Sequence, residues 1–399
     1  MENKKNYVKW YSLASIWVGG MVCVPALLVA STLIASLSFH VSLLAGLLGF
    51  SFVVFFMALI SIAAVEQRKN TVILASSSFG EHGATIVVGL VIGLSSLGWF
   101  GVQTNIAGAS FSNVVSEMNG PDIPIWLSSV FWGVVMVLTA VFGFKYLKWL
   151  NYIAVPAMVV LLVYSMVITF QEHSLREVLD FKPTSSIPLF QGIGLVIGSI
   201  TVAGVISADY NRFAITRKDA IFGVMIGIIP PGMCLLAIGA ILAITQGTYD
   251  IVEIFSSLGY PLLAMSVLIL ATWTTNVINI YSAGLAFTNL LKLNETARSK
   301  ITLFVGIVGI TLAAIGVLNY FINFITILTI TVTPIAGVLI SDYFFSKSYS
   351  ESPPPINWIG LISWASGATL MLIMSSPLKS ILGIVMSGVV YYLLKKIIK

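Results

Sequence analysis

Four polar side chains share one side of an otherwise apolar stretch near residue 275. They are Thr272, Thr275, Asn276 and Asn279. Their spacing of three, one and three residues places them on one face of an α-helix. Hydrogen bonding between helices is one explanation of such a stripe, and for a single Thr it is the commoner one. Two amides on one stripe favour a binding site, because each Asn offers donors and an acceptor to the edge of a heterocycle.

A second candidate pair is Trp99 and Gln103, which lie one helical turn apart and therefore on the same face. The indole could stack on a flat ring while the amide hydrogen-bonds to the edge of that ring. Stacking on aromatic side chains is worth about 1–3 kcal/mol per base in nucleic-acid sites. Tryptophans that anchor membrane helices lie at the ends of the spans, but Trp99 lies well inside its apolar run. We interpret the pair as a site for a planar ligand.

Ionisable residues are absent from the middle of the apolar segments. Glu66, Asp209 and Asp342 all lie near segment ends, where a proton relay is less expected. No catalytic triad, metal-binding motif or phosphate-binding loop occurs at usable spacing, so neither catalytic residues nor an organic cofactor are predicted. We therefore expect a neutral substrate rather than an enzyme. A coupling cation would need hydroxyl, amide and backbone carbonyl oxygens, which suit a hard ion such as sodium.

The elements that must position these residues are membrane-spanning helices. The 399 residues are 58% hydrophobic and 9% charged, whereas soluble domains are about 25% charged. Apolar runs of near the roughly 20 residues that cross a bilayer recur along the chain. We predict an all-α polytopic protein with a single transmembrane domain over 1–399 and twelve spans. The spans are 11–34, 41–64, 84–108, 124–143, 153–170, 188–207, 220–244, 260–281, 301–318, 321–340, 357–374 and 378–394.

The distribution of basic residues predicts the orientation. With the N-terminus in the cytoplasm, 17 of the 20 Lys and Arg residues lie on the cytoplasmic side, and only Arg176, Lys182 and Lys379 lie outside. The net charge of +5 therefore reflects topology rather than binding of nucleic acid. We expect a bacterial-type cytoplasmic membrane, both termini in the cytoplasm and the lipid bilayer as partner. The oligomeric state is left open.

Helix-breaking residues recur at matching places in two halves of the chain. They are Gly19 and Gly20 in the first span, Pro156 in the fifth, Gly198 and Gly204 in the sixth, and Pro334 in the tenth. The offsets from Gly19 to Gly198 and from Pro156 to Pro334 are 179 and 178 residues. Halves of five helices each must be inverted relative to one another, as in transporters with broken helices. The pattern predicts repeats over about 11–170 and 188–340, followed by extra helices over 357–394.

At these positions the sequence resembles the bacterial cytosine permeases and related members of the nucleobase/cation symporter family. The matching stretches are Ser15–Gly20, Leu97–Val102, Ser207–Phe213, Trp273–Asn276, Pro334–Val338 and Asp342–Tyr343. Their order and spacing run nearly end to end. The resemblance implies a LeuT-type fold, in which two inverted five-helix repeats and two C-terminal helices surround a central site with alternating access.

The resemblance also implies roles for individual residues at the substrate site. Trp99 would stack on the substrate, and polar side chains of the third and eighth spans would read its edge. Gln103 matches the amide of hydantoin-type relatives, whereas Ser96 stands where cytosine permeases have a Gln. Asn276 and Asn279 are the candidates from the eighth span. Ile200 replaces the second aromatic that relatives usually carry. This departure leaves a purine, a hydroxymethylpyrimidine or another flat heterocycle open as the substrate beside cytosine.

The same resemblance implies a sodium site, and two further residues are candidates for a gate. The sodium ligands would be backbone carbonyls near Ser12 and Ser15 together with the positions of Ala271, Thr274 and Thr275. Two phenylalanines at the start of the tenth span, Phe321 and Phe324, are candidate lid residues.

The residues and the resemblance together predict a secondary symporter that imports a nucleobase-like heterocycle with sodium. Two alternatives stay open. One is proton-coupled symport of another small neutral solute, and the other is a non-transporting channel or scaffold in the membrane.

Overall fold

The computed structural model describes every residue except 1–6, 143–146, 258–260, 347–352, 377 and 399. Within this described part the chain is almost wholly helical, and its extended pairing is one isolated bridge between Val8 and Ala214. The described α-helices are α1 (Trp10–Met21), α2 (Val24–Ile34), α3 (Phe39–Gln67), α4 (Thr71–Phe79), α5 (Glu81–Glu117), α6 (Ile125–Phe142), α7 (Leu147–Glu172), α8 (Leu175–Leu179), α9 (Leu189–Val205), α10 (Ala208–Asn211), α11 (Arg217–Gln246), α12 (Ile251–Ser256), α13 (Pro261–Leu290), α14 (Arg298–Ala314), α15 (Phe321–Ile340), α16 (Trp358–Ile373) and α17 (Lys379–Ile397). Short 3-10 turns cover Glu295–Ala297 and Val317–Tyr320, and a π-helical turn extends α15 over Ser341–Ser346.

Each of the twelve predicted spans coincides with one of these helices, except the first, which coincides with the pair α1 and α2. Among the described residues, eight helices are long and apolar enough to cross a membrane alone, and nine spans result if the bent pair α1 and α2 counts as one. The segment Pro156–Glu172 of α7 and the whole of α16 are apolar but shorter. The all-α, multi-pass architecture is therefore confirmed, while the number of twelve spans stays a prediction.

The first span is broken between α1 and α2, which meet at an angle of 61°. Pro25 explains where the break falls. Proline lacks an N–H and its ring clashes with the carbonyl four residues earlier, which here belongs to Met21, the last residue of α1. Gly19 and Gly20, the predicted breakers, lie inside α1 instead. The break is thus in the predicted span but a few residues later.

The prediction that Gly198 and Gly204 mark an interruption in the middle of the sixth span is wrong. Helix α9 runs through both glycines and pauses only at Ile206 and Ser207, before α10. Gly198 serves close packing, because a Cβ there would lie 2.6 Å from the backbone oxygen of Ile325 on α15. A glycine that faces another helix keeps its own hydrogen bonds, whereas a proline removes one.

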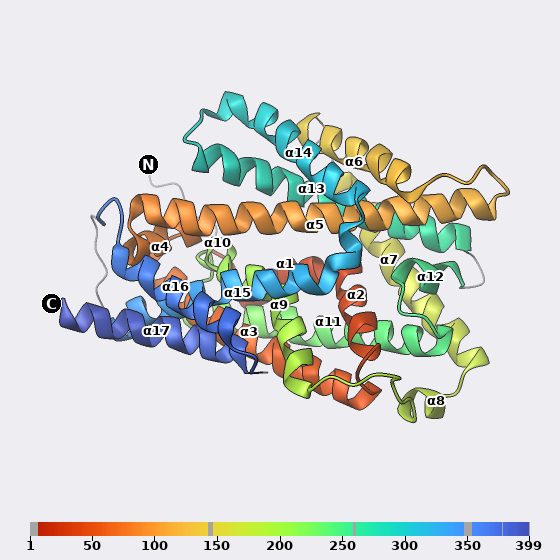
Figure 1. The fold of residues 1–399 in the computed structure, drawn as a ribbon, viewed down its shortest axis with the longest axis horizontal. Helices are drawn as coiled ribbons and strands as arrows, with labels where there is room; N and C mark the ends of the chain where they lie inside the picture. Colours follow the sequence, from red (N-terminus) through yellow and green to blue (C-terminus); the bar gives the residue numbers. More distant parts are fainter. Residues whose placement is uncertain (1–6, 143–146, 258–260, 347–352, 377, 399) are drawn as a thin grey trace.

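The helices pack in two main groups. In the first group, α5 pairs closely with α13, and both pack against α6 and α14. In the second group, α11 packs against α1, α2 and α3, and α3 packs against α9. Helix α15 joins the second group through α9 and also packs against α16 and α17. Figure 1 shows α6, α13 and α14 above α5, and α1, α9 and α11 below it. The broken first span therefore lies beside the boundary between the two groups.

Several helix ends of the second group are tied to one another. Backbone bonds join Val8 to Phe213 and to Ile215, and the guanidinium of Arg68 donates to the carbonyls of Arg212 and Ala214. These contacts link the residue that follows α3 to the loop between α10 and α11. The start of α1 is fixed to α11 as well, because the backbone N–H of Trp10 donates to the Asp219 carboxylate.

Candidate functional site

A cavity of about 160 Å³ lies where the first span breaks. Helices α1, α2, α3, α5, α9 and α11 contribute to its wall. The lining residues are Trp17, Gly20, Met21, Cys23, Pro25, Ala26, Val29, Phe50, Trp99, Ser199, Ile200, Ala203 and Ile228. None of them is an Asp, Glu, Lys, Arg or His. This central cavity therefore suits an uncharged ligand with apolar faces.

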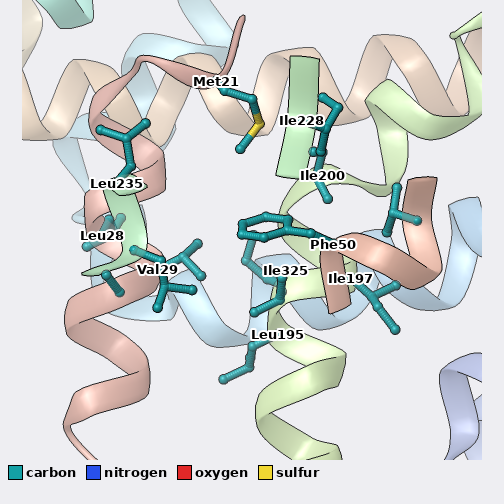
Figure 2. Close-up of a cluster of buried hydrophobic side chains, with 14 of the residues drawn as sticks. Met21, Leu28, Val29, Phe50, Leu195, Ile197, Ile200, Ile228, Leu235 and Ile325 are labelled. Atoms are coloured by element: carbon teal, nitrogen blue, oxygen red, sulfur yellow. The ribbon is translucent and has the colours of Figure 1, made fainter. Parts of the chain in front are cut away.

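Two predicted substrate residues, Trp99 and Ile200, line the central cavity. Sequence reasoning did not single out a third wall residue, Phe50 of α3. Figure 2 shows aliphatic side chains, Ile200 and Ile228 among them, around the ring of Phe50. Phe50 is 4% exposed, and a Cβ on Gly232 of α11 would lie 2.8 Å from its ring. The glycine therefore lets α11 approach the ring. Phe50 gives the cavity wall an aromatic side chain, which Ile200 does not.

The indole of Trp99 is held by the two predicted lid residues. Its ring centroid lies 5.9 Å from that of Phe321 and 5.2 Å from that of Phe324, and both contacts are edge-on. Edge-on aromatic pairs are favourable because the positive edge of one ring meets the negative face of another. Gly98 makes room for this arrangement, since a Cβ there would overlap the Phe324 ring. The structure thus brings Trp99, Phe321 and Phe324 together, and the lid role of the two phenylalanines stays a prediction.

Gln103 lies one turn beyond Trp99 on α5 and is 1% exposed. Its side-chain oxygen Oε1 is buried and accepts no hydrogen bond from any residue that the structure describes. A buried acceptor without a donor costs about 1–3 kcal/mol. Ser96, one turn before Trp99, is 9% exposed on the same helix. Neither Gln103 nor Ser96 is among the residues that line the central cavity.

The two asparagines of the polar stripe on α13 hydrogen-bond within the protein. Asn276 is fully buried, and its Nδ2 donates to the Phe100 carbonyl at 2.9 Å and to Thr104 Oγ1 at 2.8 Å. Asn279 Nδ2 in turn donates to Asn276 Oδ1 at 3.3 Å. In this conformation Asn276 joins α13 to α5, which is the interhelical explanation that the sequence left open.

The predicted sodium ligands form two separate clusters. On α13, the hydroxyls of Thr274 and Thr275 both donate to the Ala271 carbonyl, at 2.9 and 3.2 Å. On α1, Ser15 Oγ donates to the Ser12 carbonyl at 2.8 Å. No hydrogen bond joins the two clusters within the described chain, and their helices belong to different packing groups. Each cluster offers oxygen atoms only, which is the donor type that a hard cation requires.

A second cavity, of about 640 Å³, lies between α5, α13 and the segment around α10. Its wall includes the charged residues Asp209 and Lys292, in contrast to the central cavity. Asp209 Oδ1 accepts the backbone N–H of Thr71 at 2.8 Å, which orients it at the start of α4. Charged walls favour water, so we describe this second cavity as a vestibule.

Trp17 is the other wall residue that sequence reasoning missed. Its indole N–H donates to Asn211 Oδ1 at 3.3 Å, and Asn211 Nδ2 donates to Ser61 Oγ on α3. Trp17 and Asn211 are both buried, so this chain of bonds fixes α1 to α10 and α3. The signal in the sequence is the stretch Ser15–Gly20, which carries the family resemblance and contains Trp17.

Comparison with known proteins decides the family. Residues 1–353 match the model of the family described as permease for cytosine/purines, uracil, thiamine, allantoin. The chain belongs to this permease family. The permease is 30% identical over 360 residues to the cytosine permease of Escherichia coli (strain K12), which covers 89% of this chain and 81% of that relative. It is 26% identical over 362 residues to the hydantoin permease of Microbacterium maritypicum, covering 84% of this chain and 73% of that one.

Solved structures of Mhp1 have the same fold. The inward-facing conformation of Mhp1 matches with a TM-score of 0.85 at 21% identity, over 100% of this chain and 94% of Mhp1. Mhp1, a nucleobase-cation-symport-1 family transporter, in a closed conformation with bromovinylhydantoin bound matches with a TM-score of 0.80 at 20% identity, over 99% and 95%. The LeuT-type fold is therefore confirmed. The permease is a multi-pass membrane transporter and not an enzyme, as the sequence predicted.

Proposed function

We propose that this permease imports a flat, uncharged, nucleobase-like heterocycle together with sodium. The observation that carries the proposal is the indole of Trp99, which lines an uncharged cavity at the break of the first span. A ring face on an indole gives affinity for many heterocycles, because every base offers a π-face. The absence of charged groups from the wall favours a neutral molecule over an amino acid or an organic acid.

Recognition of one heterocycle among others requires hydrogen bonds to its edge. We assign this role to Gln103, whose buried oxygen has no donor among the described residues. Ser96 lies one turn on the other side of Trp99 and is the second candidate on α5. At the end of α1 the Cys23 N–H donates to the Met21 carbonyl and not to the Gly19 carbonyl four residues before it, so the Gly19 carbonyl loses its helical donor. Carbonyls freed in this way can accept from a ligand or hold a cation.

The proposed sodium site combines the two oxygen clusters on α1 and α13. The Ala271 carbonyl with the hydroxyls of Thr274 and Thr275 would form one half. Carbonyls near Ser12 and Ser15 would form the other. Since α1 and α13 belong to different packing groups, a cation between them would stabilise one relative position of the groups. This is the physical basis on which sodium could couple to alternating access.

The proposed lid is the pair Phe321 and Phe324 at the start of α15. Both rings already contact Trp99, so a small movement of this helix end would cover or expose the indole. The proposed orientation follows the positive-inside rule, with both termini in the cytoplasm of a bacterial-type cell.

Thermal stabilisation of the purified protein tests the proposal directly, because a ligand that binds only the native state must raise its unfolding temperature. The panel is cytosine, uracil, a purine, a hydroxymethylpyrimidine, allantoin, a hydantoin and a neutral amino acid, each in sodium and in choline medium at one pH. We expect one flat heterocycle to stabilise the protein, and to do so more strongly in sodium. Stabilisation by the amino acid alone would overturn the substrate class.

Uptake into proteoliposomes separates the alternatives. We expect saturable uptake that requires a sodium gradient. Uptake that needs no sodium and instead follows a pH gradient in choline medium would show that protons are the coupling ion. Flux that rises linearly with substrate concentration would identify a channel, and the absence of any flux by a folded protein would identify a scaffold.

A further inference from the structure

A long apolar groove runs along the outside of the bundle between α3, α15 and α17. Its volume is about 500 Å³. Helix α15 packs against both α3 and α17, so it forms the floor of the groove, and α3 and α17 form the walls. The lining residues are Phe52, Phe55, Phe56, Leu59, Gly337, Ile340, Ser341, Phe345, Ile384, Val385, Gly388, Val389 and Tyr392.

The floor of the groove is deep because small residues bring α15 and α17 together. A Cβ on Gly337 would lie 2.2 Å from the Ile384 carbonyl, so only glycine fits there. The hydroxyl of Ser341 donates to the Gly388 carbonyl at 2.7 Å. This bond satisfies the one hydroxyl on the floor, so the groove offers almost no polar group below Tyr392.

The groove ends at a basic pocket. A cavity of about 210 Å³ is lined by Phe345, Ser346, Tyr392, Lys395 and Lys396. Phe345 and Tyr392 line both cavities, so the apolar groove continues directly into the basic pocket. The hydroxyl of Ser346 is buried and has no hydrogen-bond partner among the described residues. The pocket thus presents two ammonium groups and a free hydroxyl at the end of the last membrane helix.

We propose that this groove and pocket bind one anionic phospholipid. An acyl chain fits the groove, because hydrocarbon needs no hydrogen bonds and a membrane-facing groove excludes water. From Ile384 to Tyr392 the wall covers nine helical residues. Their eight rises span about 12 Å, which is most of one leaflet of a hydrocarbon core about 30 Å thick. The phosphate lies against Lys395 and Lys396, where basic pockets at membrane surfaces hold anionic headgroups.

The lipid bridges α3 and α17, which both pack against α15. It contacts α3 of one packing group and α17 at the outer edge of the bundle. Its binding stabilises the packing of α3, α15 and α17 as they stand here, independently of the transported substrate.

Native mass spectrometry of the full chain tests the site. The delipidated protein is titrated with dioleoylphosphatidylglycerol or with dioleoylphosphatidylcholine, and the lipids bound per chain are counted. We expect one saturable phosphatidylglycerol per chain. A single basic residue near a membrane surface favours anionic lipid by roughly fivefold, so the two lysines give a preference of about 25-fold. Equal binding of the two lipids by the parent protein overturns the proposal.

Two variants separate the contribution of the lysines to lipid binding from that of the groove. Lys395→Gln/Lys396→Gln removes the preference for the anionic lipid. Val385→Trp fills the groove and weakens the binding of both lipids. The matched controls are Lys218→Gln/Lys300→Gln, which removes the same charge from exposed positions outside the groove, and Leu372→Trp on an exposed face of α16. Thermal unfolding in detergent checks that each variant is folded.

The variants can overturn the headgroup site and the lipid assignment of the groove separately. A preference that survives in the lysine variant, or that falls equally in its control, overturns the headgroup site. A dimer that forms on delipidation and is lost in Val385→Trp assigns the groove to a second copy of the chain instead. Failure of Val385→Trp to fold leaves the lysine variant, whose side chains lie at the surface, to decide the proposal.

Discussion

The indole of Trp17 meets the phenol ring of Tyr210 edge-on, with 5.3 Å between the ring centroids and 74° between the planes. Trp17 lines the central cavity and Tyr210 lines the vestibule. The contact between the two rings therefore lies between the two cavities. The bond from Trp17 to Asn211 holds the indole in this position. We infer that this aromatic pair closes the path by which a ligand would pass from the central cavity to the vestibule.

Tyr210→Ala should accelerate release of bound substrate into the vestibule. Removal of the ring leaves Trp17 without its partner, and aromatic pairs contribute about 0.5–1.5 kcal/mol beyond their buried area. The expected increase in the dissociation rate is therefore roughly twofold to tenfold. Release of a radiolabelled ligand from the purified protein measures it. Tyr210→Phe keeps the ring and should behave as the parent; an alanine variant with the parental rate would show that the pair is not a barrier.

Trp99→Ala should weaken the binding of many flat ligands by a similar factor. The loss of roughly 1–3 kcal/mol of stacking corresponds to about a fivefold to hundredfold increase in dissociation constant, with the order of ligands unchanged. Equilibrium binding across the heterocycle panel measures this. Trp99→Phe is the control, since it keeps a ring face and should lose less. If folded Trp99→Ala binds its best ligand as tightly as the parent, Trp99 is a packing residue and the proposed site is misplaced.

Gln103→Leu should change the order of the ligands. A hydrogen-bonding amide discriminates between heterocycle edges that a ring face cannot distinguish. Because Oε1 has no donor in the described structure, replacing the amide by an apolar side chain of similar size should not destabilise the ligand-free protein. Binding of the panel and the unfolding temperature without ligand are measured together. An unchanged ligand order, or a large fall in the unfolding temperature, would assign Gln103 to the core of the bundle.

Thr275→Ala should weaken the sodium dependence of substrate binding. It removes one proposed cation ligand and leaves Trp99 intact. A contact to a charged group is worth about 1.5–3 kcal/mol, so the half-maximal sodium concentration should rise by about tenfold or more. Since equilibrium coupling is reciprocal, any fall in the factor by which sodium raises substrate affinity must appear equally in the factor by which substrate raises sodium affinity. Thr275→Ser keeps the hydroxyl and serves as the control; parental sodium activation in the alanine variant would place the cation elsewhere.

The sequence predicted the helices well because burial in a bilayer requires about 20 apolar residues, and that length is visible without a structure. The contact of Trp99 with Phe321 and Phe324 could not be predicted, because the sequence marks the two phenylalanines only as candidate lid residues at the start of a span. The position of the helix breaks was less predictable. Glycine is common both at breaks and at close helix contacts, and Gly198 proved to be a contact.

The wall of the central cavity could be predicted only in part. Phe50 and Trp17 are aromatic residues inside apolar spans, where most such side chains simply pack against neighbours. Their role depends on where α1 ends, and Pro25 fixes that point through its missing N–H. Hydrogen bonding of Asn276 to α5 was equally hidden, because an amide suits a ligand and a neighbouring helix alike.

Ile200→Phe should narrow the range of substrates. Ile200 lines the central cavity at the position where the family resemblance implies an aromatic residue, and the cavity is only about 160 Å³. A phenyl ring adds a further aromatic face to those already in the wall, worth roughly 1–3 kcal/mol for a ligand that still fits. Single-ring heterocycles should therefore bind about fivefold to hundredfold more tightly, while two-ring purines should bind more weakly because the larger side chain occupies their space. Ile200→Leu keeps the volume without a ring and should leave both classes unchanged. Competition binding with one-ring and two-ring ligands measures the difference, and an equal gain for both classes would show that Ile200 does not limit the size of the substrate.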